Sequence, residues 1–185
     1  EFHMLADSGE DSIAFSTESD FAANVELAEA LMPQAVAAEF ETMTLFNTPD
    51  AKTIDALSKN HDIAPDTSLK TLFVENAQGG LVALVLRGDQ QLNEIKAEKI
   101  SGISQPLRMA QESAVRTATG ASFGSLGPVG LDVRIVVDRA ASVLTNFVCG
   151  ANEDGKHLKG VNWQRDIPKF EVADLRTVSA GDPSP

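Results

Sequence analysis

The sequence predicts an α+β fold in which a mixed, largely antiparallel sheet is surrounded by helices. Two pairs of apolar, strand-like segments each flank a short loop that contains glycine, a pattern typical of β-hairpins. Helix-like segments and a Gly-rich stretch separate these pairs, so helices and strands do not alternate one by one. Runs of strands followed by runs of helices favour α+β over a parallel α/β sheet.

The predicted elements follow from local patterns along the chain. Pro49 and Asp50 after Thr48 form a typical helix start, and Ile54 and Leu57 lie one turn apart and share a face. The predicted helices are residues 21–32, a helix that starts at 48–50, 92–99 and 107–117, with a linker at 33–41. The predicted strands are residues 13–15, 69–75, 81–87, 133–137, 146–150 and 158–163.

Composition limits the classes of function. The chain has 185 residues, 43% hydrophobic and 23% charged, which is typical of one globular domain. The net charge of −12 excludes a uniformly basic face that grips many phosphates, but it allows a local basic pocket for one nucleic-acid end. Aromatic residues make up 5% of the chain, which argues against a platform that stacks many bases.

Cysteine and histidine usage argues against disulfides and metal sites. Cys149 is the single cysteine, so no disulfide framework and no cysteine-based zinc site is expected. His3, His61 and His157 have no partners at the spacing of a known zinc motif, and we expect no metal. The longest apolar run, residues 81–86, is far short of the roughly 20 residues of a membrane span. Without a signal-peptide pattern, we expect a cytoplasmic protein that does not contact membranes.

Two features have both a structural and a functional interpretation. Lys70 interrupts an apolar strand, either as an edge lysine that protects against aggregation or as a cation at the mouth of a pocket. The Gly-rich stretch at residues 124–128 is either a plain turn or a loop whose backbone amides form an oxyanion hole. His157 follows Asp154 and Gly155 and is a surface turn residue in the simplest interpretation.

A serine-hydrolase site is a weaker alternative. Gly120, Ser122 and Gly124 match the nucleophile-elbow pattern G-x-S-x-G, and Asp138 and His157 follow in the chain order of an α/β-hydrolase triad. The elbow requires a strand before the serine and a helix after it. Here a helix-like run precedes the serine and Gly-Pro follows, so the pattern fits poorly.

Taken together, ordered motifs over nearly the whole chain resemble the insertion domain of bacterial prolyl-tRNA synthetase, a YbaK-like aminoacyl-tRNA deacylase. No single motif carries this resemblance; the ordered set does. The motifs are TP..KTI at 48–54, KTL at 70–72, RGD..LNE.K at 87–96, GSLGP at 124–128, VDR at 137–139, GAN..GKH at 150–157 and GVNW.RD at 160–166.

The resemblance implies a division of the chain and a set of partners. Residues 1–38 would flank the insertion on the side of the catalytic domain, 39–172 would form the editing domain, and 173–185 would return toward the catalytic domain. The partners would be the 3′ acceptor end of tRNA(Pro) and the catalytic domain of the parent synthetase. The editing reaction would need no cofactor, although the parent synthetase would use ATP and Mg²⁺.

The resemblance also implies an activity, hydrolysis of mischarged Ala-tRNA(Pro), and roles for individual residues. Lys70 would hold the phosphate or terminal adenosine, and Ile54 and Leu57 would measure the aminoacyl side chain. Asp138 would belong to the same substrate site, either as a substrate contact or as a structural residue, and His157 would contribute to the choice between alanine and proline. The loop whose amides would orient the ester and stabilise the oxyanion consists of Gly124, Ser125, Leu126, Gly127 and Pro128.

Two further hypotheses remain beside the deacylase. The chain could be a non-catalytic module that binds the tRNA acceptor end or stabilises a synthetase, or a small-molecule esterase built on Ser122. The net charge of −12 further predicts weak binding of free tRNA by this chain alone, because phosphate contacts with Lys and Arg drive such affinity.

Overall fold

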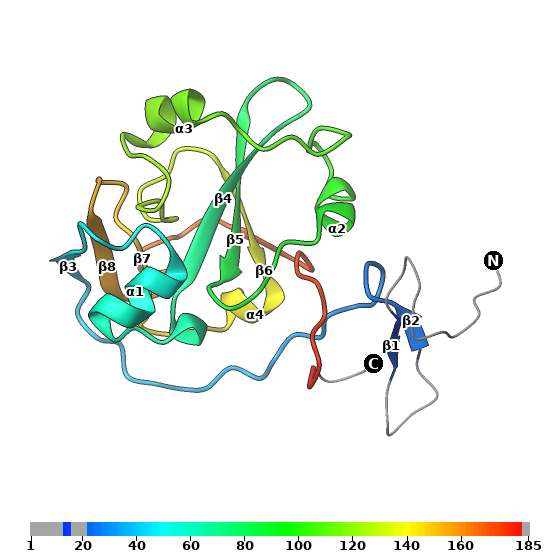
Figure 1. The fold of residues 1–185 in the computed structure, drawn as a ribbon, viewed down its shortest axis with the longest axis horizontal. Helices are drawn as coiled ribbons and strands as arrows, with labels where there is room; N and C mark the ends of the chain where they lie inside the picture. Colours follow the sequence, from blue (N-terminus) through cyan, green and yellow to red (C-terminus); the bar gives the residue numbers. More distant parts are fainter. Residues whose placement is uncertain (1–12, 16–21, 183–185) are drawn as a thin grey trace.

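The computed structural model describes residues 13–15 and 22–182, which form two main sheets with short helices around them (Figure 1). Residues 1–12 and 16–21 of the predicted flanking segment and residues 183–185 at the end of the predicted return segment lie outside this description. The strands are β1 (Ile13–Phe15), β2 (Ala22–Asn24), β3 (Thr44–Asn47), β4 (Leu69–Glu75), β5 (Leu81–Arg87), β6 (Arg134–Asp138), β7 (Phe147–Gly150), β8 (Lys156–Val161) and β9 (Glu171–Ala173). The helices are α1 (Ile54–His61), η1 (Pro65–Thr67), α2 (Glu94–Glu98), α3 (Glu112–Thr119) and α4 (Arg139–Ser142).

The larger sheet is mixed and has the strand order β4-β5-β6-β9. Strands β4 and β5 pair antiparallel along their whole length, whereas β5-β6 and β6-β9 are parallel pairs. Strand β5 is apolar at nearly every position because both faces of the sheet are covered there. One face packs toward the second sheet, and the other packs on α2 and on the chain near Leu175.

The smaller sheet is antiparallel, with the order β3-β8-β7, and its β7-β8 hairpin is the second of the two predicted hairpins. Strand β7 lies against β4, where Ser68 and Val148 form a parallel bridge. The core between the sheets contains Phe73, Phe147 and Trp163, and the Trp163 indole donates a 2.9 Å hydrogen bond to the Ala141 carbonyl. The predicted fold class, mixed and largely antiparallel α+β, is confirmed.

The predicted helix over residues 21–32 is wrong within its described part. Residues 22–24 form β2, and the chain then turns because the Asn24 side chain and carbonyl accept from the amides of Glu26, Leu27 and Ala28. Ala28 and Ala30 are buried, but the larger side chains of Leu27 and Met32 are 60% and 51% exposed, so the segment does not bury one continuous helical face. Packing of an apolar face, more than propensity, stabilises short helices in water.

Other element boundaries also differ from the predictions. Helix α1 begins at Ile54 and is capped by Thr53, whereas Thr48 lies before it and its amide donates to the Gly155 carbonyl in the neighbouring turn. The predicted helix over 107–117 begins only at Glu112, since the chain before it pairs with the edge of β4. Strands β3 and β9 and helix α4 were not predicted, and residues 33–41 form the predicted linker without helix or strand.

The segments that lead into and out of the domain lie side by side. Figure 1 shows the chain after β2 and the chain after β9 meeting at one end of the larger sheet. The Ala30 amide donates to Asp174 over 3.1 Å, and Arg139 pairs with Glu29. The chain segments around Ala30 and Asp174 are therefore neighbours in space.

Candidate functional site

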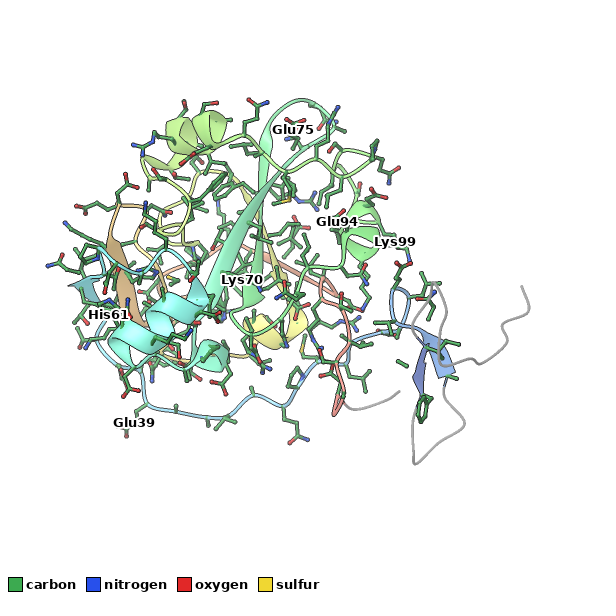
Figure 2. The ribbon with its side chains drawn as sticks, in the orientation of Figure 1. Glu39, His61, Lys70, Glu75, Glu94 and Lys99 are labelled. Atoms are coloured by element: carbon green, nitrogen blue, oxygen red, sulfur yellow. The ribbon has the colours of Figure 1, made fainter. Side chains whose placement is uncertain are left out.

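A cavity of about 430 Å³ lies between α1, β4, the segment before α3 and the Gly-rich loop. Figure 2 shows Lys70 on β4 beside α1, and both elements contribute residues to the wall of this cavity. Aliphatic and aromatic side chains form most of its walls. The lining residues are Lys52, Thr53, Ile54, Leu57, Leu69, Lys70, Thr71, Leu72, Phe73, Met109, Ala110, Phe123, Gly124, Leu126, Gly150 and His157.

Helix α1 supplies one apolar wall. The Thr53 hydroxyl accepts a 3.1 Å hydrogen bond from the Ala56 amide and fixes the start of the helix. Ile54 and Leu57 face the cavity together, as their one-turn spacing predicts, and Leu57 is buried against Ala51. The wall is therefore rigid at the place where the resemblance expects a side chain to be measured.

Lys70 lies at the border between this cavity and a second, more open one of about 390 Å³. The second cavity is lined by Thr53, Ile54, Asp55, Pro65, Lys70, Gly88, Asp89 and Gln91. Within the described residues, the Lys70 ammonium makes no ion pair or hydrogen bond. Burial lowers the pKa of Lys70 below its ordinary value, and the charge of Asp89 acts against that shift. The side chain is thus a half-buried cation available to an anionic ligand.

The loop at residues 124–128 is held by close backbone contacts. Gly124 has a φ of +96°, and a Cβ there would lie 2.8 Å from the Cα of Lys52. A Cβ on Gly127 would lie 1.9 Å from the Gly150 carbonyl oxygen, so the loop rests directly on β7. Only glycine permits both approaches.

The loop uses some of its polar groups internally and leaves others unused. The Gly127 amide donates to the Asn152 side chain over 3.0 Å, and the Ser125 hydroxyl accepts from the Gly155 amide over 3.0 Å. Pro128 has no amide hydrogen, and neither it nor Gly127 lines the cavity. Gly124 and Leu126 line the cavity, and their amides donate no hydrogen bond within the described residues. Any oxyanion contact from this loop would therefore come from these two amides rather than from all five residues.

His157 lies in the cavity wall and not on the surface of a turn. It is 6% exposed, and its Nδ1 atom lies 2.6 Å from the hydroxyl of the equally buried Thr48. Burial lowers the pKa of His157 to about 4, and the nearby His61 adds to the shift. The imidazole is therefore neutral at neutral pH and contributes shape and hydrogen bonding, not positive charge.

Asp138, predicted to bind substrate, does not line the cavity, and its expected position is corrected. It is fully buried at the end of β6, where its two carboxylate oxygens accept from the amides of Ala140 and Leu175 over 2.9 Å each. These bonds cap α4 and fix the chain after β9. Asp138 is therefore a structural residue that joins two segments of the backbone.

The serine-hydrolase constellation does not form. The Ser122 hydroxyl contacts Arg116 and lies 3.5 Å from Asp154, while its amide donates to Asp154 over 2.7 Å. His157 pairs with Thr48 and Asp138 with backbone amides, so the three triad candidates have separate partners. Ser122 also follows the C-cap of α3 and does not follow a strand, as an elbow requires.

Several cavity residues were not predicted from the sequence. Met109 and Phe123, 49% and 48% exposed, line the cavity while remaining open to solvent, which places them at its rim. Thr71 lines the inner wall next to Lys70. Phe123 could have been noticed as a large apolar residue inside the Gly-rich stretch, but the position of Met109 depends on how its segment packs on β4.

Neither a metal cluster nor a membrane helix is found in the described part of the chain. No group of three or more His, Cys, Asp or Glu side chains there could hold a metal ion. None of the helices in residues 13–15 and 22–182 is long and apolar enough to cross a bilayer.

Fold and cavity together define a small α+β domain with a largely apolar cavity of about 430 Å³ and a cation at its border. Residues 48–167 match the family model of the aminoacyl-tRNA editing domain. This match covers more than half of the chain, so the chain belongs to the aminoacyl-tRNA editing domain family. Membership indicates deacylase activity on aminoacyl-tRNA and, with it, binding of tRNA.

Solved structures show the same fold. The hypothetical protein APE2540 matches with 25% identity and a TM-score of 0.61, over 73% of this chain and 91% of that chain. A candidate trans-editing enzyme for prolyl tRNA synthetase matches with 19% identity and a TM-score of 0.62, over 72% of this chain and 86% of that chain.

Proposed function

We propose that this chain hydrolyses the ester of Ala-tRNA(Pro) and so removes alanine from mischarged tRNA. The observation that carries the proposal is one cavity that combines an apolar wall, a half-buried lysine and two unused backbone amides. Ile54 and Leu57 supply the wall, Lys70 the cation, and Gly124 and Leu126 the amides. Each feature matches one requirement of deacylation: a side-chain pocket, an anchor for the nucleotide and stabilisation of an oxyanion.

The apolar wall explains why a small amino acid is the proposed substrate. A synthetic site built for proline discriminates poorly against the smaller alanine, since a missing methylene is worth only about 1–3 kcal/mol. A second site can sort in the opposite direction by excluding the larger side chain. Leu57 is buried, and Gly124 lies against the backbone of Lys52. These contacts restrict movement of the two cavity walls.

Lys70 is proposed to bind the terminal nucleotide of tRNA. It lines both cavities, so an ester placed in the first cavity would have its adenosine or phosphate directed toward the second. Contacts with phosphate position a nucleic acid without reading its sequence. At the rim, the half-exposed ring of Phe123 offers an apolar surface for the last base, because bases stack readily on aromatic side chains.

The proposed chemistry relies on positioning rather than on a strong side-chain base. The titratable side chains that line the cavity are Lys52, Lys70 and His157, and the low pKa of His157 makes it a weak base. Water would attack the ester carbonyl, the carbonyl–ribose oxygen bond would break, and the ribose oxygen would leave with a proton that water supplies. The products are alanine and a free 3′ end. Good positioning can lower such a barrier by about 7–11 kcal/mol at best.

We further propose that residues 39–172 are an editing insertion of a bacterial prolyl-tRNA synthetase, with 1–38 and 173–185 leading to its cytoplasmic catalytic domain. The adjacent entry and exit segments, joined through Ala30 and Asp174, support this arrangement, because an insertion must leave its host domain at neighbouring points. ATP and Mg²⁺ would then serve the synthetase reaction alone. The related candidate trans-editing enzyme suggests free-standing action as the alternative.

The test is deacylation of Ala-tRNA(Pro) by this chain and by the full-length protein that contains it. We expect wild-type protein to release alanine and to leave Pro-tRNA(Pro) intact, whereas Lys70→Ala loses most of the activity. Ser122→Ala is the matched control and should remain active, since Ser122 does not line the cavity.

Three results would contradict the proposal. Alanine release by both proteins at the rate of spontaneous hydrolysis, with tRNA still bound, would favour the non-catalytic binding module. Unchanged activity in Lys70→Ala would remove the proposed nucleotide anchor. Loss of activity in Ser122→Ala, together with covalent labelling by a fluorophosphonate, would favour the esterase.

A further inference from the structure

Thr71 places a buried hydroxyl without a partner in the wall of the cavity. The residue is 7% exposed, and its Oγ1 atom has no hydrogen-bond partner within the described residues. Strand β4 pairs Thr71 with Val85 of β5, so the backbone of Thr71 belongs to the sheet. Leu69 and Phe73 lie on the same face of β4 and flank the hydroxyl with apolar surface.

Such a hydroxyl lowers stability unless a ligand pairs with it. Burying an unpaired polar group costs about 1–3 kcal/mol, whereas an apolar side chain of the same shape costs nothing of this kind. Valine has the shape of threonine and an equal or higher preference for strands. The polar residue at position 71 is therefore best explained by what enters the cavity.

The cavity offers few other side-chain oxygens as acceptors. Among the described residues that line it, only Thr53 and Thr71 have side-chain oxygens, and no carboxylate is present. The Thr53 hydroxyl is already used to cap α1, and the Nδ1 atom of His157 is paired with Thr48. Thr71 is thus the available side-chain oxygen for a polar group of a bound ligand.

We propose that the Thr71 hydroxyl binds the α-amino group of the aminoacyl substrate and makes the site select amino acid esters over other acyl esters. This inference rests on the proposed function for the identity of the ligand. The α-carbon of the bound amino acid carries both the side chain and the amino group. If the side chain is directed toward Ile54 and Leu57, the amino group is directed toward a different wall of the cavity. Thr71, on β4 beside Lys70, provides that wall.

The charges around the cavity favour the neutral amine. A free α-amino group has a pKa of about 7.7–8.0, and nearby cations and burial lower it further. Lys52 and Lys70 line the cavity, and none of its described lining residues has a negative charge. A neutral amine both donates and accepts, so it can pair with the Thr71 hydroxyl in either direction.

The test compares two hydrolysis-resistant adenosine analogues that carry alanine or propionate as a 3′-amide. They differ in the α-amino group alone, and binding is measured by NMR titration without turnover. We expect wild-type protein to bind the alanyl analogue about tenfold more tightly, the value of one good hydrogen bond. Thr71→Val should reduce this ratio to about one by weakening only the alanyl analogue, while Thr71→Ser should preserve it. Thr71→Ala provides a second variant without the hydroxyl.

The melting temperature gives an independent readout. Thr71→Val should melt at the wild-type temperature or above it, because it replaces an unpaired hydroxyl by a methyl group. Equal weakening of both analogues in Thr71→Val and Thr71→Ala, or no wild-type preference for the alanyl analogue, would overturn the assignment. Absence of binding to either analogue would also overturn it. A wild-type protein that shows the preference but does not hydrolyse Ala-tRNA(Pro) would contradict the proposed function alone.

Discussion

Replacing Gly127, which does not itself line the cavity, by alanine should displace the Gly-rich loop. A Cβ at this position would lie 1.9 Å from the Gly150 oxygen, about 1.4 Å closer than an ordinary carbon–oxygen contact of about 3.3 Å. The contact is between two backbones, so no side chain can rotate away. The loop, which carries Gly124 and Leu126, must therefore move off β7 by roughly that distance.

The magnitude of the effect follows from this displacement. A misplacement of about 1 Å in a site that works by positioning can cost about 100-fold in rate. Overpacking of a tight contact costs about 1–3 kcal/mol of stability. We therefore expect Gly127→Ala to remain folded under assay conditions but to deacylate Ala-tRNA(Pro) about 100-fold more slowly than wild type.

The matched control is Gly79→Ala in the β4-β5 turn. Gly79 has a φ of +84°, and no atom lies within 4 Å of its added Cβ, so alanine there adds backbone strain without steric displacement. Single-turnover deacylation and urea unfolding of both variants separate activity from stability. Wild-type activity in Gly127→Ala, or equal loss of activity in both variants, would refute the idea that the close contact with Gly150 positions the loop.

Three further predictions address Asp138, His157 and cofactors. Asp138→Asn should lose about 1–3 kcal/mol in urea unfolding, since one amide of Ala140 or Leu175 loses its acceptor, with unchanged activity per folded molecule. His157 has a pKa of about 4 in the folded chain against about 6.5 unfolded, so the unfolded state binds more protons between these values. The free energy of unfolding should therefore fall by about 2 kcal/mol from pH 7 to pH 5. The same change of pH should lower it by less in His157→Gln, which lacks the titrating imidazole. Excess EDTA should not change the deacylation rate, because the proposed chemistry uses no metal.

The proposed roles of the site residues can be tested separately because these residues lie on three elements. The side-chain wall belongs to α1, the nucleotide anchor and the amino-group contact to β4, and the oxyanion amides to the loop after α3. A change in one element should therefore affect one kinetic property. Variants of Thr71 should change discrimination between acyl groups, whereas Gly127→Ala should slow hydrolysis of every ester.

Local patterns were sufficient for the elements that carry their own turn signals. The β4-β5 hairpin has the predicted bounds, because two β-rich runs flank a loop with two glycines. The β7-β8 hairpin was also predicted, with strand ends displaced by one or two residues. The helix predicted over residues 21–32 shows the limit of local patterns. Good helix formers that do not bury one continuous face here form a strand, a turn and extended chain.

The candidate site was only partly accessible from the sequence. Ile54, Lys70, Gly124 and His157 were singled out separately, and the structure brings them into one cavity. Asp138 was grouped with them through a motif, yet its carboxylate is turned to backbone amides on the other side of β6. A motif identifies the residues that accompany a fold but does not say which of them face the ligand.

The sequence by itself determined the fold class, both hairpins, the likeness to editing domains and six of the sixteen residues that line the cavity. These properties depend on neighbours along the chain, such as strand alternation, turn glycines and helix caps. The tertiary structure alone decided where Met109 and Phe123 lie, which loop amides have no partner among the described residues, and that the Thr71 hydroxyl has none among them either. Those facts depend on contacts between segments distant in sequence, such as Gly127 with Gly150 and Thr48 with His157, whose geometry is set by packing.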